Sequence, residues 1–173
     1  MTVTQRRAGS GKTPLVVGWR EWVALEALGL PAIKAKIDTG ARTSALHAFY
    51  VEPITIDGRT RVRFGIHPLQ ERTDIEVNCV ADAVDHRRVS DSGGHRELRW
   101  VIRAPLRIGG ESWPIEITLT NRDDMMFRML IGRTAMPRRL VVDPARSYVL
   151  GKPPAIPYRR RSRPHETRTG KRR

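Results

Sequence analysis

The chain has 173 residues, of which 39% are hydrophobic and 29% charged, and its formal net charge is +14 at pH 7. This length suits one domain with a buried core and is short for two. No apolar run approaches the roughly 18 residues of a membrane-spanning helix, and the basic N-terminus lacks the apolar segment of a secretory signal. Cys79 is the only cysteine, so an internal disulfide is excluded. We therefore expect a cytoplasmic protein without membrane contact, in which Cys79 is a buried structural thiol.

The positive charge is concentrated at the two ends of the chain. Residues 152–173 contain nine Lys or Arg residues and four Pro residues, against one acidic residue, Glu166. A segment this basic and this poor in apolar residues is typical of disorder. We predict basic, disordered tails at residues 1–13 and 152–173 around one domain at residues 14–151, and unchanged folding when residues 152–173 are deleted. The C-terminal tail favours at most a weak contact with a polyanion such as RNA or the ribosome.

The body of the chain alternates apolar and polar residues with a period of two, which predicts half-buried strands. Asp57-Gly58 and Gly109-Gly110 are typical of tight hairpin turns. Residues 132–136 are expected to form a short helix before Pro137. The predicted strands cover residues 19–25, 33–37, 44–56, 60–66, 75–84, 98–108, 113–119, 126–131, 140–142 and 148–150. Many short strands joined by tight turns predict an all-β fold, either a compact barrel or a sandwich.

Asp38 directly follows the predicted strand at residues 33–37 and begins the triplet Asp38-Thr39-Gly40. A carboxylate at this place is either an ordinary turn residue or an acid held on a rigid loop. Gly40 would let a backbone amide approach the carboxylate, which a Cβ atom would hinder. Later parts of the sequence are needed to decide between the two interpretations.

Four motifs occur in a fixed order and together resemble the retropepsins, the homodimeric aspartic proteases. They are D-T-G-A-R-T-S-A-L-H at residues 38–47, S-D-S-G-G-H at residues 90–95, T-L-T-N-R at residues 118–122 and M-L-I-G-R at residues 129–133. The resemblance is strongest to the bacterial branch known as the ATP-dependent zinc protease family, and it covers roughly residues 16–151. It implies a closed acid-protease barrel with one short C-terminal helix.

The resemblance also implies an aspartic endopeptidase that hydrolyses peptides or proteins. Its catalytic residues would be Asp38, Thr39 and Gly40, with Asp38 meeting its copy across a two-fold axis and the pair sharing one proton. Ser44 would bind the outer carboxylate oxygen, and a flap at residues 88–98 would cover the substrate. The implied substrate-binding residues are Ala41, Arg42, Ser44, Ser92, Gly93, Gly94 and Arg96.

A second triplet, Asp91-Ser92-Gly93, offers an alternative in which one chain supplies both aspartates. It follows Arg87 to Ser90 rather than an apolar strand, which favours the tip of a flap instead. No zinc motif and no complete phosphate-binding loop are present, so we expect neither a metal nor a cofactor. A further alternative is a non-catalytic module of the same fold that binds acidic peptides or RNA. Arg42 and Arg96 would either form plain structural ion pairs or select acidic side chains. The second interpretation accords with the resemblance, because members of this family accompany glutamate-adding ligases.

Overall fold

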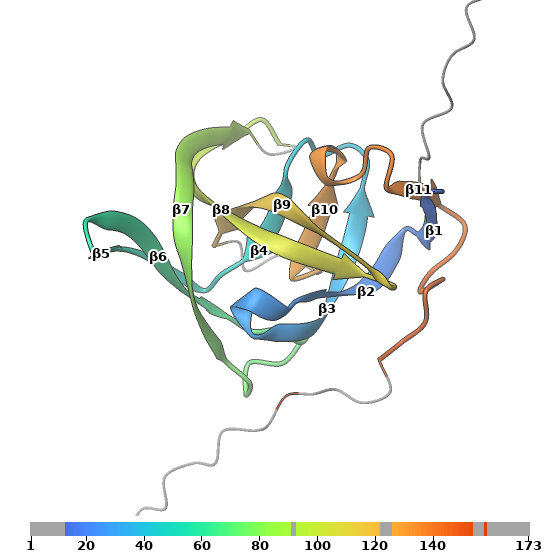
Figure 1. The fold of residues 1–173 in the computed structure, drawn as a ribbon, viewed down its shortest axis with the longest axis horizontal. Coiled ribbons are helices and arrows are strands. Elements are labelled where there is room, and N and C mark those ends of the chain that lie inside the picture. Colours follow the sequence, from blue (N-terminus) through green and yellow to red (C-terminus); the bar gives the residue numbers. More distant parts are fainter. Residues whose placement is uncertain (1–12, 91–92, 122–125, 154–157, 159–173) are drawn as a thin grey trace, which may run out of the picture.

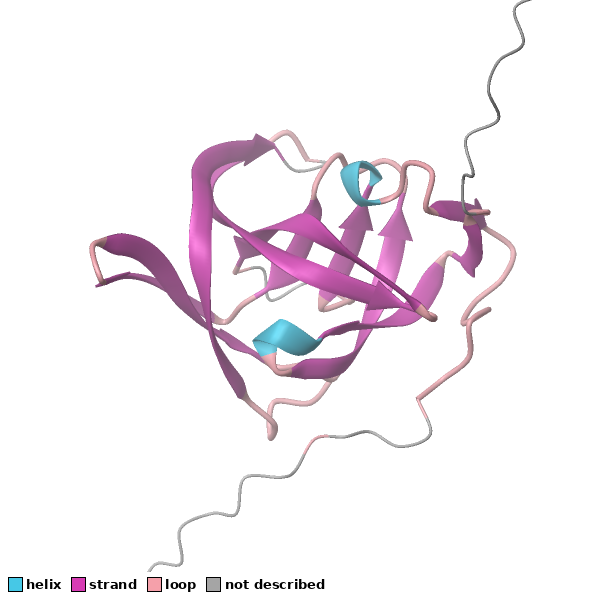
Figure 2. Cartoon of the chain, in the orientation of Figure 1, coloured by secondary structure: helices cyan, strands magenta, loops and turns pink. Residues whose placement is uncertain are grey.

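A computed structural model describes residues 13–90, 93–121, 126–153 and 158. In this part of the chain the regular elements are strands and two three-residue 3-10 turns, η1 (Glu26–Leu28) and η2 (Arg133–Ala135), as Figure 2 shows. The prediction of an all-β fold is therefore confirmed. The strands are β1 (Leu15–Gly18), β2 (Arg20–Leu25), β3 (Leu30–Asp38), β4 (Ser44–His47), β5 (Tyr50–Ile56), β6 (Arg59–Ile66), β7 (Val77–Ser90), β8 (Arg96–Ile108), β9 (Glu111–Thr120), β10 (Met129–Gly132) and β11 (Leu140–Asp143).

The main sheet is mixed and has the strand order β2-β3-β10-β4-β9-β8-β7-β6-β5. It curls so that β2 also pairs with β8, whereas β6 and β5 extend away as a separate arm (Figure 1). A second, two-stranded sheet joins β1 and β11 in parallel. No helix among the described residues is long and apolar enough to cross a membrane.

The sheet forms a partial ring rather than the closed barrel that the sequence implied. The ring is joined by only two residue pairs, Val23 with Ile108 and Ala24 with Arg107. The reason lies in the length of β8, whose first half pairs with the 14-residue strand β7 while its second half pairs with β9. The sheet therefore forks at β8, and β7 leads away from the ring.

The core lies inside the ring and follows the alternation that the sequence shows. In β3, Ile33, Ala35 and Ile37 are at most 5% exposed, and Met129 and Ile131 of the parallel strand β10 are fully buried beside them. Alternate residues of β3 point to the outer face of the sheet. This packing gives the end of β3 a rigid support.

Three predicted elements differ in kind from the observed ones, and others, such as β7 and β10, differ in their bounds. The predicted strand at residues 44–56 divides into β4 and β5, because the chain turns after His47. The predicted helix is the single 3-10 turn η2, since Pro137 has no N–H group to donate to the carbonyl of Arg133. Residues 148–150 are not a strand, because the N–H groups of Val149 and Leu150 bind the buried carboxylate of Glu21 instead.

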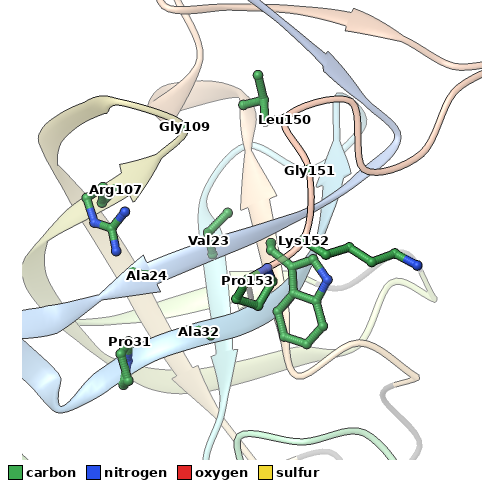
Figure 3. A pocket seen from close by; sticks show the side chains of 11 residues that line it. Val23, Ala24, Pro31, Ala32, Arg107, Gly109, Leu150, Gly151, Lys152 and Pro153 are labelled. Atoms are coloured by element: carbon green, nitrogen blue, oxygen red, sulfur yellow. The ribbon is translucent and has the colours of Figure 1, made fainter. Parts of the chain in front are cut away.

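The C-terminal segment contacts the fold beyond the predicted domain boundary at residue 151. Lys152 and Pro153 line a shallow pocket of about 180 Å³ (Figure 3), which Trp22 also lines. Farther on, the hydroxyl of Tyr158 donates to the carbonyl of Ala32 in β3. Burial raises the pKa of Tyr158 to about 12. The rest of the predicted tail from residue 154 on lies outside the described residues.

We therefore expect a chain that ends at residue 151 to be less stable than one that ends at residue 158. Burying an aromatic side chain contributes on the order of 2 kcal/mol to the free energy of unfolding, and urea unfolding measures the difference. Because the folded-state pKa of Tyr158 is raised, the contribution should be present below about pH 10 and be lost as the pH rises through 12. Equal stability of the two chains would show that the Tyr158 contact is dispensable, as the sequence suggested.

Candidate active site

Asp38 is the last residue of β3, and β3 runs parallel to β10 in a register that places Asp38 beside Gly132. The side chain of Asp38 is 25% exposed, whereas the preceding Ile37 points into the core. The carboxylate therefore stands on a buried strand but reaches the surface. This position favours an acid on a rigid support over an ordinary turn residue.

The loop after Asp38 folds back onto its carboxylate. Oδ1 accepts hydrogen bonds from the backbone N–H groups of Gly40 (3.0 Å) and Ala41 (3.2 Å). A Cβ atom at position 40 would lie 3.2 Å from this oxygen. The expected reason for Gly40 is thus confirmed, and the two amides fix the orientation of the carboxylate.

Arg133 clamps the same loop from the other side. Its Nη1 donates to the carbonyl oxygens of Thr39 (3.1 Å) and Gly40 (3.0 Å), and its backbone N–H donates to Ala41 (2.8 Å). These bonds join η2 to the loop across more than 90 residues of sequence. The M-L-I-G-R motif therefore supports the D-T-G-A motif directly. Thr39 itself is exposed, and its predicted contact with a second copy stays a prediction.

Ser44 and Gly132 form the layer beneath the loop. Ser44 is fully buried, and its Oγ accepts a hydrogen bond from the N–H of Gly132 at 3.1 Å. The carbonyl of Ser44 accepts a hydrogen bond from Thr118 Oγ1 at 3.1 Å, which explains the first threonine of the T-L-T-N-R motif. The structure thus places Ser44 as a support of the loop. The expected bond from Ser44 to the outer oxygen of Asp38 is absent from the described hydrogen bonds, and its role toward a substrate stays a prediction.

The predicted flap is a hairpin. β7 and β8 pair up to Ser90 and Arg96, and Gly94 has the positive φ of 81° that a tight turn requires. Gly93, Gly94 and Arg96 are exposed, as is Arg42 on the Asp38 loop. In Figure 1 the end of β7 and the end of β3 both lie toward the upper edge of the molecule. Asp91 and Ser92 lie outside the described residues, so the second triplet is not tested.

Sequence reasoning missed an ion pair on this hairpin in which only the arginine is buried. The side chain of Arg99 is only 7% exposed, whereas that of Glu97 is 47% exposed. The Nε of Arg99 donates to Glu97 Oε2 at 2.8 Å, and Thr120 Oγ1 also points to this carboxylate, at 3.5 Å. Thr120 is 23 residues from Glu97 in the sequence, so no local pattern indicates this contact.

Other reactive side chains lie away from Asp38. Cys79 is buried, its thiol donates to the carbonyl of Leu28 at 3.1 Å, and burial raises its pKa to about 12. The predicted structural thiol is therefore confirmed. His47 is 1% exposed on β4, as a packed histidine is. Within the described ranges, no three His, Cys, Asp or Glu side chains gather as metal ligands would. That finding leaves the metal-free mechanism a prediction.

The same residues carry the similarity of this chain to known proteins. The family model described as "Retropepsin-like aspartic endopeptidase RimB" matches residues 16–153, from β1 to the segment beside Trp22. The chain belongs to the RimB-like family. The match includes the Asp38 loop, the hairpin and the Arg133 clamp, so the recognised resemblance to retropepsin-like aspartic proteases is confirmed for nearly all of the described fold.

Relatives of this RimB-like chain include longer proteins. It is 46% identical over 136 residues to a "Probable alpha-L-glutamate ligase" of Shewanella pealeana and 48% identical over 137 residues to one of Parasynechococcus marenigrum. These matches cover 79% of this chain but only 30% and 29% of the two relatives. The chain therefore spans about a third of the length of the curated relatives it matches.

A solved structure has the same fold. It is the protein Lpg0085 of unknown function (DUF785) from Legionella pneumophila, with a TM-score of 0.63 and 26% sequence identity. The similarity covers 78% of this chain and 97% of that one. The mixed sheet with its partial ring is thus also found in an experimental structure.

Proposed function

We propose that this RimB-like protein is an aspartic endopeptidase in which two Asp38 carboxylates meet across the two-fold axis of a homodimer. The observation that carries the proposal is the Asp38 carboxylate itself, mounted on a buried strand and oriented by the Gly40 and Ala41 amides. The Arg133 clamp keeps the loop in this shape. A turn residue without a chemical role needs no such support.

In the proposed reaction, one Asp38 carboxylate takes a proton from a water molecule while the water oxygen bonds to the peptide carbonyl carbon. The second Asp38, protonated, donates a hydrogen bond to the carbonyl oxygen as negative charge develops there. The resulting tetrahedral species collapses, the C–N bond breaks, and the leaving nitrogen takes up a proton from the dyad. The flap hairpin would exclude bulk water during these steps.

We further propose that the substrates are acidic or glutamate-modified peptides. Arg42 lies exposed on the Asp38 loop, and Arg96 lies exposed on the hairpin. Guanidinium groups bind carboxylates in a bidentate manner, which suits both positions to glutamate side chains. Longer relatives whose name is alpha-L-glutamate ligase support the same substrate class.

A dilution series tests assembly and activity together. The purified protein is given a defined mixture of peptides, half of them rich in Glu, and the products are mapped by mass spectrometry. We expect cleavage of the Glu-rich peptides, with a specific activity that falls on dilution as light scattering shows the dimer dissociating. A fully active monomer would refute the dimeric dyad and turn attention to Asp91. Peptide binding without cleavage would support the non-catalytic binding module instead.

A further inference from the structure

Lys36 lies two residues before Asp38 on β3, so both side chains leave the strand on the same face. The ammonium Nζ of Lys36 lies 3.7 Å from Asp38 Oδ2, and the two side chains are 45% and 25% exposed. The other oxygen, Oδ1, accepts the amides of Gly40 and Ala41. Each carboxylate oxygen therefore has its own partner, and Lys36 faces the oxygen that the loop amides leave unused.

Neighbouring cations on this face have other partners. Arg20 is opposite Lys36 in the pairing of β2 with β3, but its Nε donates to Ser147 Oγ at 3.1 Å. The ammonium of Lys34 lies over the ring of Trp22, 5.4 Å from the ring centroid. Neither side chain competes with Lys36 for the Asp38 carboxylate.

Charged groups on other elements near Asp38 are bonded to other partners or are exposed. Glu21 of β2 is fully buried, and its carboxylate accepts the N–H groups of Gly18 and Val149. Arg133 of η2 donates to backbone carbonyls of the loop, and Arg42 is exposed on that loop. Among the described residues, Lys36 thus has the only charged side chain that lies within ion-pair distance of Asp38.

We propose that Lys36 is a positioning residue that holds Oδ2 of Asp38 and offsets the negative charge of the catalytic pair. This inference rests on the proposed function and deepens it. Two carboxylates that share one proton carry a net negative charge, and a nearby cation stabilises that charged form. Lys36 would therefore keep the pair in its singly protonated, active state toward lower pH, without contacting the substrate.

The test compares Lys36→Met with Lys36→Arg and with the control Lys34→Met, a lysine on the same strand and face. Exposed ion pairs contribute little, so we expect kcat of Lys36→Met to fall only roughly two- to fivefold at the native optimum. KM should stay unchanged, and the pH–rate profile should move to higher pH. Lys36→Arg should restore the native profile, and Lys34→Met should keep it.

An unchanged profile in Lys36→Met, or an equal shift in Lys34→Met, would overturn the role of Lys36. The proposed function would survive such a failure of the Lys36 test, provided that the Asp38→Asn variant is inactive in the same assay. A native protein that cuts no peptide would instead refute the proposed function, and the role of Lys36 with it. Thermal unfolding of the three lysine variants serves to confirm that they are folded.

Discussion

Replacing Asp38 with Asn should lower peptide hydrolysis by roughly 10³-fold or more, because the reaction loses its general base. The fold should survive, since Asn has the same shape and its side-chain oxygen still accepts hydrogen bonds from Gly40 and Ala41, at the 3.0 and 3.2 Å seen for Asp38 Oδ1. The amide group of Asn, however, takes no proton from water at ordinary pH. Turnover of a mapped peptide and thermal unfolding measure the two effects separately.

Asp57→Asn is the matched control for this substitution. Asp57 lies in the turn between β5 and β6 with a φ of 51°, a conformation that Asn also tolerates. The control removes the same charge from a hairpin outside the ring and should keep the native rate. An Asp38→Asn variant that cleaves as fast as this control would show that the aspartic mechanism is wrong.

Mixing native and Asp38→Asn chains tests the two-fold pairing itself. In an equimolar mixture that exchanges subunits at random, about half of the native chains have a variant partner. If one site needs two Asp38 carboxylates, activity per native chain falls to about half of its original value. An unchanged activity per native chain would indicate that each chain carries a complete site.

Replacing Gly132 with Ala should have the largest effect on stability. A Cβ atom at this position would lie 2.4 Å from the carbonyl carbon of Thr43, 2.6 Å from its oxygen and 2.8 Å from the nitrogen of Ser44. These are backbone atoms, so no side-chain rotation relieves the clash. Separating β10 from the chain before β4 would also break the bond from Gly132 to Ser44 Oγ. We expect a loss of about 3 kcal/mol in the free energy of unfolding, as for overpacked cores.

Gly110→Ala is the control for this substitution. Position 110 has no heavy atom within 4 Å of the added Cβ and no positive φ, so the variant should be as stable as the native protein. Urea unfolding measures both variants. Because Gly132 lies beside Asp38, the Gly132→Ala variant should also lose peptidase activity under conditions in which it is still folded. A native-like midpoint for Gly132→Ala would show that β10 and Thr43 move apart at little cost.

Sequence by itself determined the features that depend on near neighbours along the chain. Alternation predicted most strands, and the Asp57-Gly58 turn has the two positive φ values, 51° and 72°, that this pair is suited to adopt. The bond from Gly40 to Asp38 spans only two residues, so the triplet alone indicated it. Local geometry and side-chain period are sufficient to specify such contacts.

Only the tertiary structure decided which distant residues support the site. Ser44 and Gly132 are 88 residues apart, and Glu21 binds Val149 across 128 residues, which turned a predicted strand into a loop. The strand period alone brings Lys36 and Asp38 to the same face of β3. Only the fold shows that Arg20, which is opposite Lys36, donates to Ser147 and leaves Asp38 to Lys36. Contacts of this kind depend on how the sheet curls and forks at β8, and that curvature is set by the packing of the whole core rather than by any local pattern.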